Sequence, residues 1–92
     1  MASYRVLIKP LAATEIEAVD QKTDHRRIVA KIRSLAQDPR PHGNERLAGQ
    51  EDRYRIRSGR DRIIYSIGDG ELVVVVVRVG HRREVIDRRT RG

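Results

Sequence analysis

Residues 53–85 decide the fold, and they read RYRIRSGRDRIIYSIGDGELVVVVVRVGHRREV. The segment contains three runs with strand character, over 53–57, 62–67 and 72–79. In the first run, tyrosine and isoleucine alternate with arginine, which is the period of a strand buried on one face. The second run is rich in isoleucine, and the third is almost unbroken valine, as in a central strand covered on both faces. These runs predict three antiparallel strands that share one apolar face and carry arginines on the other.

Turn residues separate these three runs. Gly59-Arg60-Asp61 stands between the first two and Gly68-Asp69-Gly70 between the second and third, and both sequences favour hairpins. The third run ends at Gly80, and His81-Arg82-Arg83-Glu84 follows at once. Five arginines fall between positions 53 and 62, with a single aspartate among them. The segment therefore predicts a rigid β platform that presents a dense cationic cluster.

The N-terminal half predicts one more strand and two helices. Residues 3–8 alternate well enough for a short strand. Apolar residues at helical spacing then predict helices over 11–19 and 25–37. The segment Asp38–Pro41 ends the second helix, since two prolines in three residues cannot continue it. Residues 42–50 are expected to form a loop.

The predicted order of elements is therefore β-α-α-β-β-β. Two helices can cover one face of a four-stranded, mainly antiparallel sheet, which gives a two-layer α+β domain. Ninety-two residues suffice for a single such domain, 1–92. The basic tail at 87–92 is expected to fray.

The composition narrows the class of protein. The chain has no cysteine, which excludes disulfides and cysteine-based metal sites and favours a reducing compartment. The longest aliphatic run, Leu72–Val77, is far too short to span a bilayer. His25 and His42 have no ligand spacing between them, so no metal site is expected. These features predict a soluble, cytoplasmic protein without a membrane partner.

The net charge of +7 indicates a polyanionic partner, either nucleic acid or an acidic protein. Of the 20 basic residues only Lys9, Lys22 and Lys31 are lysines, so arginine dominates. The planar guanidinium group suits phosphate recognition. A GC-rich genome would raise the arginine content whatever the function, so the clustering of arginines is more informative than their number.

Three segments stand in a distinctive order along the chain. They are Leu47-Ala48-Gly49, then Y-R-I-R-S-G-x-x-R-I-I-Y at 54–65, and V-V-V-V-x-R-V-G-H-R-R-E-V at 73–85. Together with the helix pair and the D-P-R-P break, this set resembles the RelE/ParE superfamily of bacterial and archaeal toxins, and is closest to the RelE branch. The resemblance implies a RelE-like fold and a small toxin of a type II toxin-antitoxin system, held inactive by a cognate antitoxin.

RelE-type toxins enter the ribosomal A site and cut messenger RNA there, so the resemblance implies the ribosome and mRNA as partners. The ribose 2′-hydroxyl attacks the adjacent phosphate without a metal or other cofactor, leaving a 2′,3′-cyclic phosphate and a free 5′-hydroxyl. This chemistry requires a base, cations for the phosphorane charge and an acid for the leaving oxygen. By resemblance the basic pair falls on Arg55 and Arg57, the next arginine on Arg62, and the arginine after the final strand on Arg82.

One position departs from the family. Ile86 stands where a C-terminal tyrosine is expected, and isoleucine can neither stack on a base nor exchange a proton. His81 is the candidate for that role, since unperturbed histidine has a pKa of about 6.5. Arg55 and Arg57 keep their protons at physiological pH, so they can stabilise charge but are poor bases. The candidate RNA- and phosphate-binding residues around this site are Arg53, Arg60 and Arg83.

Other interpretations are open at this point. Arg55 and Arg57 could form the solvated outer face of a strand, and Arg62 could pair with Asp61 or Glu84. The alternative functions are a ParE-like inhibitor of DNA gyrase without nuclease activity, and a catalytically degenerate toxin that only binds its antitoxin. The basic cluster argues against gyrase inhibition, whereas the replacement of the tyrosine argues mildly for it.

Overall fold

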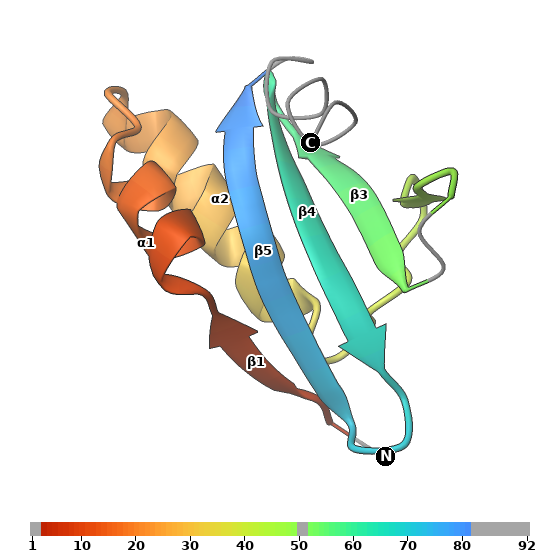
Figure 1. Ribbon diagram of the computed structural model, residues 1–92. Coiled ribbons are helices and arrows are strands. Elements are labelled where there is room, and N and C mark those ends of the chain that lie inside the picture. The colour runs from red at the N-terminus through yellow and green to blue at the C-terminus, as the bar shows by residue number, and fades with distance from the viewer. Residues whose placement is uncertain (1–2, 50–51, 82–92) are drawn as a thin grey trace.

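The computed structural model describes residues 3–49 and 52–81. The elements are β1 (Arg5–Ile8), α1 (Pro10–Glu17), α2 (Lys22–Ser34), β2 (Glu45–Arg46), β3 (Arg53–Ser58), β4 (Asp61–Gly68) and β5 (Val73–His81). Both helices lie on the same side of the sheet, as Figure 1 shows, so the predicted two-layer α+β architecture is confirmed. None of the described helices has the length and apolar character needed to cross a bilayer.

The strands form one mixed sheet in the order β1-β5-β4-β3-β2. β1 runs parallel to β5, and the other neighbours are antiparallel. Both predicted hairpins are present, β3 to β4 and β4 to β5. In the first hairpin Ser58 pairs with Asp61, which leaves a two-residue turn. Gly59 has a φ of +64° in that turn, a conformation that glycine adopts without steric cost.

The sequence predicts four strands and a loop over 42–50, but the structure has a fifth strand within that loop. Glu45 and Arg46 form a fifth strand, β2, which pairs with β3 opposite Arg55 and Tyr54. Two residues are too few to show an alternating pattern, so this strand exists only because β3 supplies its hydrogen-bonding partner. The consequence is that Glu45 lies beside the arginines of β3.

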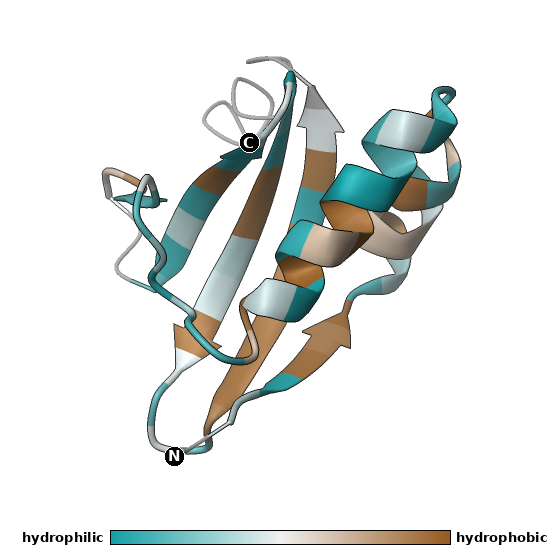
Figure 2. Cartoon of the chain, turned by 180° about the vertical axis from the view of Figure 1, so that it is seen from behind, coloured by the Kyte–Doolittle hydropathy of each residue, from teal (hydrophilic) through white to brown (hydrophobic). Residues whose placement is uncertain are grey.

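Helix α2 begins three residues earlier than expected, at Lys22. Asp24 therefore lies within the first turn, where a negative charge interacts favourably with the helix dipole, while Lys31 and Arg33 lie in the last turn. The helix contributes Ile28 and Ile32 to the interior. Figure 2 shows apolar residues along the helix and along the strands of the sheet behind it.

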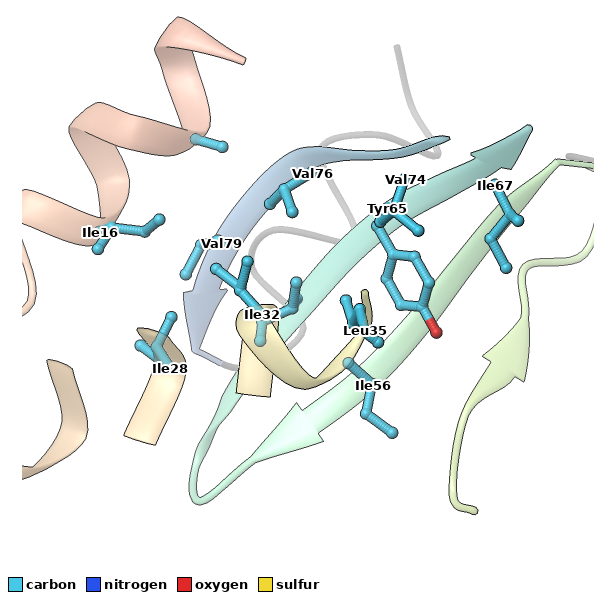
Figure 3. Close-up of a cluster of buried hydrophobic side chains, with 12 residues drawn as sticks. Ile16, Ile28, Ile32, Leu35, Ile56, Tyr65, Ile67, Val74, Val76 and Val79 are labelled. Atoms are coloured by element: carbon cyan, nitrogen blue, oxygen red, sulfur yellow. The ribbon is translucent and has the colours of Figure 1, made fainter. Parts of the chain in front are cut away.

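The core between the helices and the sheet is aliphatic, with one tyrosine. Figure 3 shows side chains from both layers pointing into the same cluster. Burial of each large aliphatic side chain contributes about 1.5–3 kcal/mol relative to exposure. The labelled members are Ile16, Ile28, Ile32, Leu35, Ile56, Tyr65, Ile67, Val74, Val76 and Val79.

At one edge of the sheet, helix α1 takes the place of a strand. β1 pairs with β5 only as far as Val76. Beyond this point Glu15 of α1 accepts a hydrogen bond from the backbone N–H of Val79 at 2.7 Å, and another from Nη2 of Arg78 at 2.7 Å. The carboxylate therefore satisfies a strand-edge donor and joins α1 to the sheet.

A polar cluster joins the N-terminal strand, the loop after α2 and the β4–β5 turn. Asp69 accepts a hydrogen bond from the Tyr4 hydroxyl at 2.7 Å, and Nη2 of Arg40 donates to it at 2.9 Å. The Arg40 guanidinium also lies 5.3 Å from the ring centroid of Tyr54. The hydrogen bonds from Arg40, and then from Tyr4, lower the pKa of Asp69. This cluster holds the loop after α2 against the sheet.

Candidate functional site

The face of the sheet that carries no helix presents the arginines of the β3–β4 hairpin. On β3, Arg55 and Arg57 alternate with Ile56 and Ser58, which are buried. Arg57 stands directly opposite Arg62 in the register of the two strands. Like charges in directly opposed positions destabilise a sheet. This pair therefore points to a role for positive charge at this place rather than to a contribution to stability.

These arginines surround a hollow of about 320 Å³, which we call the arginine hollow. It is lined by Gly43, Glu45, Arg55, Arg57 and Arg62. Three residues expected to be catalytic thus come together from two neighbouring strands, and β2 adds a carboxylate. Gly43 forms part of the wall with a φ of +96°, a backbone conformation that favours glycine.

Glu45 is the site residue that sequence reasoning missed. Its carboxylate accepts a hydrogen bond from Nη2 of Arg55. That bond, with the charge of Arg55 and smaller contributions from the charges of Arg62 and Arg57, lowers the pKa of Glu45. Nothing in the local sequence marks this residue, because its place depends on the pairing of β2 with β3. The carboxylate is therefore held ionised among three guanidinium groups.

Arg57 and Arg62 take no part in the ion pairs formed within residues 3–49 and 52–81. Those pairs are Arg40–Asp69, Arg55–Glu45 and Arg78–Glu15. Asp61, one partner considered for Arg62, is 5% exposed and alternates with Arg62 along β4, so the two side chains leave the strand on opposite faces. Glu84, the other partner considered, lies outside the described residues.

The other residues expected at the site are not among the described residues that line the arginine hollow. Arg53 is on the same face of β3 but does not line the arginine hollow, and Arg60 is exposed in the β3–β4 turn. The backbone of His81 pairs with Asp61, the residue before Arg62, at the end of β5. Arg82, Arg83, Ile86 and the tail at 87–92 lie outside the described residues.

The composition of the arginine hollow determines what it can bind. Three guanidinium groups offer several N–H donors in fixed planar forks, which match the oxygens of a phosphate group. An ionised carboxylate beside them can accept a proton, which arginine cannot do at physiological pH. The lining residues within 3–49 and 52–81 include no large apolar side chain. It therefore suits a phosphorylated ligand better than an apolar one.

Comparisons with known proteins identify the family of the chain. The family model described as "ParE toxin of type II toxin-antitoxin system, parDE" matches residues 6–86. No curated protein sequence matches the chain significantly. Among solved structures, the isolated E. coli RelE toxin is 27% identical, with a TM-score of 0.74 over 97% of this chain and 97% of that chain.

Two toxin–antitoxin complexes contain similar chains. A chain of the archaeal RelE–RelB complex from Pyrococcus horikoshii is 26% identical, with a TM-score of 0.78, over 89% of this chain and 98% of that chain. A chain of the intact E. coli RelBE toxin–antitoxin complex is 28% identical, with a TM-score of 0.73, over 87% of this chain and 98% of that chain. The expected RelE-like fold is confirmed. Because the family model spans most of its length, the chain belongs to the ParE toxin family of type II toxin-antitoxin systems, within the RelE/ParE superfamily.

Proposed function

We propose that this toxin is a ribosome-dependent endoribonuclease that cleaves messenger RNA in the A site by metal-free transesterification. The arginine hollow is the observation that supports this most strongly. Arg57 and Arg62 are opposed in register although their charges repel, and an anionic ligand between them offsets that repulsion. A phosphodiester placed in the hollow would also lie beside Glu45, the one group among its described lining residues that can accept a proton.

The proposed reaction assigns a role to each of these side chains. The ribose 2′-oxygen attacks the adjacent phosphorus while its proton passes to the carboxylate of Glu45. Arg57 and Arg62 donate to the non-bridging oxygens, whose negative charge grows in the phosphorane. The bond from phosphorus to the 5′-oxygen then breaks, and His81 supplies the proton that the leaving oxygen takes up. The products are a 2′,3′-cyclic phosphate and a free 5′-hydroxyl.

Arg55 acts on Glu45 and on the phosphate in this proposal. Its hydrogen bond holds the carboxylate inside the hollow and lowers its pKa. The carboxylate is therefore ionised at neutral pH and ready to accept a proton, although a lower pKa makes it a weaker base. This arrangement supplies the base that Arg55 and Arg57 cannot provide themselves.

A cognate antitoxin is the proposed protein partner, and an apolar groove is its proposed site. A hollow of about 510 Å³ between β1 and the two helices is lined by residues that include Val6, Ile16, Val29 and Ile32. Ile8, which lines it from β1, is 43% exposed. An amphipathic segment with an acidic outer face would cover this surface and complement the charge of the toxin. The RelE–RelB complexes of the relatives support the same view.

Gyrase inhibition is the second candidate function. The match to a family model described as ParE toxin favours it, as does isoleucine in place of the C-terminal tyrosine. A toxin of this kind would leave RNA intact, so the arginine hollow would have no phosphodiester to cleave.

One experiment separates these functions. The chain is expressed alone under tight control in a translating extract, RNA ends are mapped, and gyrase supercoiling is measured in parallel. RNA cut only in the presence of ribosomes, with unchanged supercoiling, supports the nuclease. Inhibited supercoiling with intact RNA supports the gyrase inhibitor. Neither effect, together with unarrested growth of expressing cells, identifies a toxin that only binds its antitoxin.

A further inference from the structure

Arg57 lines a second hollow in addition to the arginine hollow. This second space, of about 460 Å³, lies between helix α2 and the end of the β3–β4 hairpin, and we call it the α2 groove. Arg27, Lys31 and Ser34 line it from the helix, and Arg57 and Ser58 from β3. Arg57 is the residue that the two hollows share.

The shortness of β2 explains why the two hollows meet. β2 pairs with β3 only at Tyr54 and Arg55, so the described sheet has no strand beside Arg57 and Ser58 on that edge. Arg57, beside this unpaired edge, lines both hollows.

The α2 groove is cationic. Arg27 and Lys31 are four residues apart and so lie on one face of the helix. The Arg27 guanidinium reaches the β3–β4 turn, since a Cβ on Gly59 would lie 3.5 Å from its Nη1 atom. Among the described residues that line the groove, none is acidic. Within the described part of the chain, none of the three ion pairs includes Arg27, Lys31 or Arg57.

We propose that the α2 groove binds the sugar–phosphate backbone of the RNA strand whose neighbouring phosphate occupies the arginine hollow. Arg27 and Lys31 neutralise phosphates outside the reacting one, and Arg57 joins the two sites. The identity of the strand rests on the proposed nuclease function. An acidic peptide suits the groove less well, because, of the lining residues that the structure describes, only Ala30 is apolar apart from aliphatic stems. The apolar surface that a peptide needs lies instead beside β1.

The test measures binding without cleavage. The full chain is titrated with a fluorescent single-stranded RNA of about ten nucleotides, 2′-O-methylated throughout so that it cannot react. Affinity is followed by anisotropy at several salt concentrations. Arg27→Ala/Lys31→Ala removes the two helix charges of the groove. Lys22→Ala/Arg26→Ala is the matched control, since it removes the same two residue types at the same spacing from a different hollow, one that also contains Asp20.

The proposal predicts that Arg27→Ala/Lys31→Ala weakens binding by about tenfold or more. It also predicts a smaller dependence of log K on log salt, by about 1.4 for two lost phosphate contacts on a single strand. The control should bind within about twofold of the unaltered chain. Equal losses in both double variants would overturn the proposal, because net charge alone would then explain binding. No loss in either variant would overturn it as well.

Two further outcomes separate this proposal from its alternatives. If Arg27→Ala/Lys31→Ala weakens RNA binding and the control does not, while unmodified RNA stays intact on ribosomes, the groove binds RNA but the nuclease proposal fails. A polyglutamate peptide of the same charge serves as the second probe. If it binds more tightly than RNA and loses affinity in Arg27→Ala/Lys31→Ala, the occupant is an acidic protein and the RNA proposal is overturned.

Discussion

Glu45 and Arg55 face each other across the β2–β3 pair and form an ion pair inside the arginine hollow. The shortest strand of the sheet therefore brings a carboxylate to the centre of the cationic cluster. Because Arg57 and Arg62 are near enough to lower the pKa of Glu45 further, the four side chains form one electrostatic unit.

Replacement of Glu45 by glutamine tests the proton acceptor. Glu45→Gln keeps the shape and one acceptor oxygen but cannot take the 2′-hydroxyl proton. We expect cleavage of ribosome-bound mRNA to slow by about 10²-fold or more under single-turnover conditions, while affinity for uncleavable RNA stays the same or rises. Glu71→Gln, in the exposed β4–β5 turn, is the control. A rate within a few fold of the unaltered toxin would exclude Glu45 as the base.

Removal of Arg55 tests the origin of the lowered pKa. In Arg55→Ala the main hydrogen bond to Glu45 is lost, so the pKa of Glu45 should rise toward its ordinary value, about 4.3. A carboxylate with a depressed folded-state pKa adds stability above its unfolded pKa, and this is lost as pH falls through the folded pKa. Arg55→Ala should therefore show a smaller acid-dependent loss of stability. Carbon-13 NMR titration of the Glu45 carboxyl checks the shift, and an unchanged midpoint would contradict it.

Arg57→Gln should change stability and activity in opposite directions. Relief of the repulsion opposite Arg62 is expected to stabilise the fold by about 0.2–1 kcal/mol. Loss of a phosphorane-stabilising charge should slow cleavage by about 10²-fold. Urea unfolding and single-turnover cleavage measure the two effects, with Arg5→Gln on β1, at the far edge of the sheet, as control. A destabilised Arg57→Gln would mean that the charge contributes to the fold.

Glu15→Ala should destabilise the edge of the sheet. Glu15 and Arg78 are only 19% and 16% exposed. The substitution leaves the Arg78 guanidinium and the Val79 N–H without their acceptor, at a cost of about 1–3 kcal/mol. Glu17→Ala, exposed on the same helix, should change stability much less. Equal midpoints of urea unfolding for the two variants would show that Glu15 does not act as the substitute for a strand.

The sequence predicts the hairpins well because their signals are local. Arg55 and Arg57 alternate with buried residues over a full strand, so the face they occupy follows from the period of the strand. Arg62 joins them because a two-residue turn at Gly59 sets the register. The grouping of these three arginines can therefore be predicted from the local sequence of the hairpin, without knowledge of the rest of the chain.

The position of Glu45 could not be predicted in the same way. Its strand is two residues long, and its partner lies ten residues further along the chain. Only the tertiary pairing with β3 separates this glutamate from the other exposed acids of the loops. The α2 groove is a similar case, since Arg27 and Arg57 belong to different layers and line one groove only through the tertiary fold. Local sequence patterns predict the face of a strand or helix on which a residue lies. The complete site depends on contacts between segments that are distant in the sequence.

The nuclease proposal is tested by the rate at which Arg62→Ala cleaves mRNA on purified ribosomes, measured in a single turnover beside Arg5→Ala. We expect the unaltered toxin and Arg5→Ala to form 2′,3′-cyclic phosphate ends at similar rates. Arg62→Ala should be slower by about 10²–10³-fold. Cleavage by Arg62→Ala at the unaltered rate, or 3′-hydroxyl ends from the unaltered toxin, would exclude the proposed mechanism.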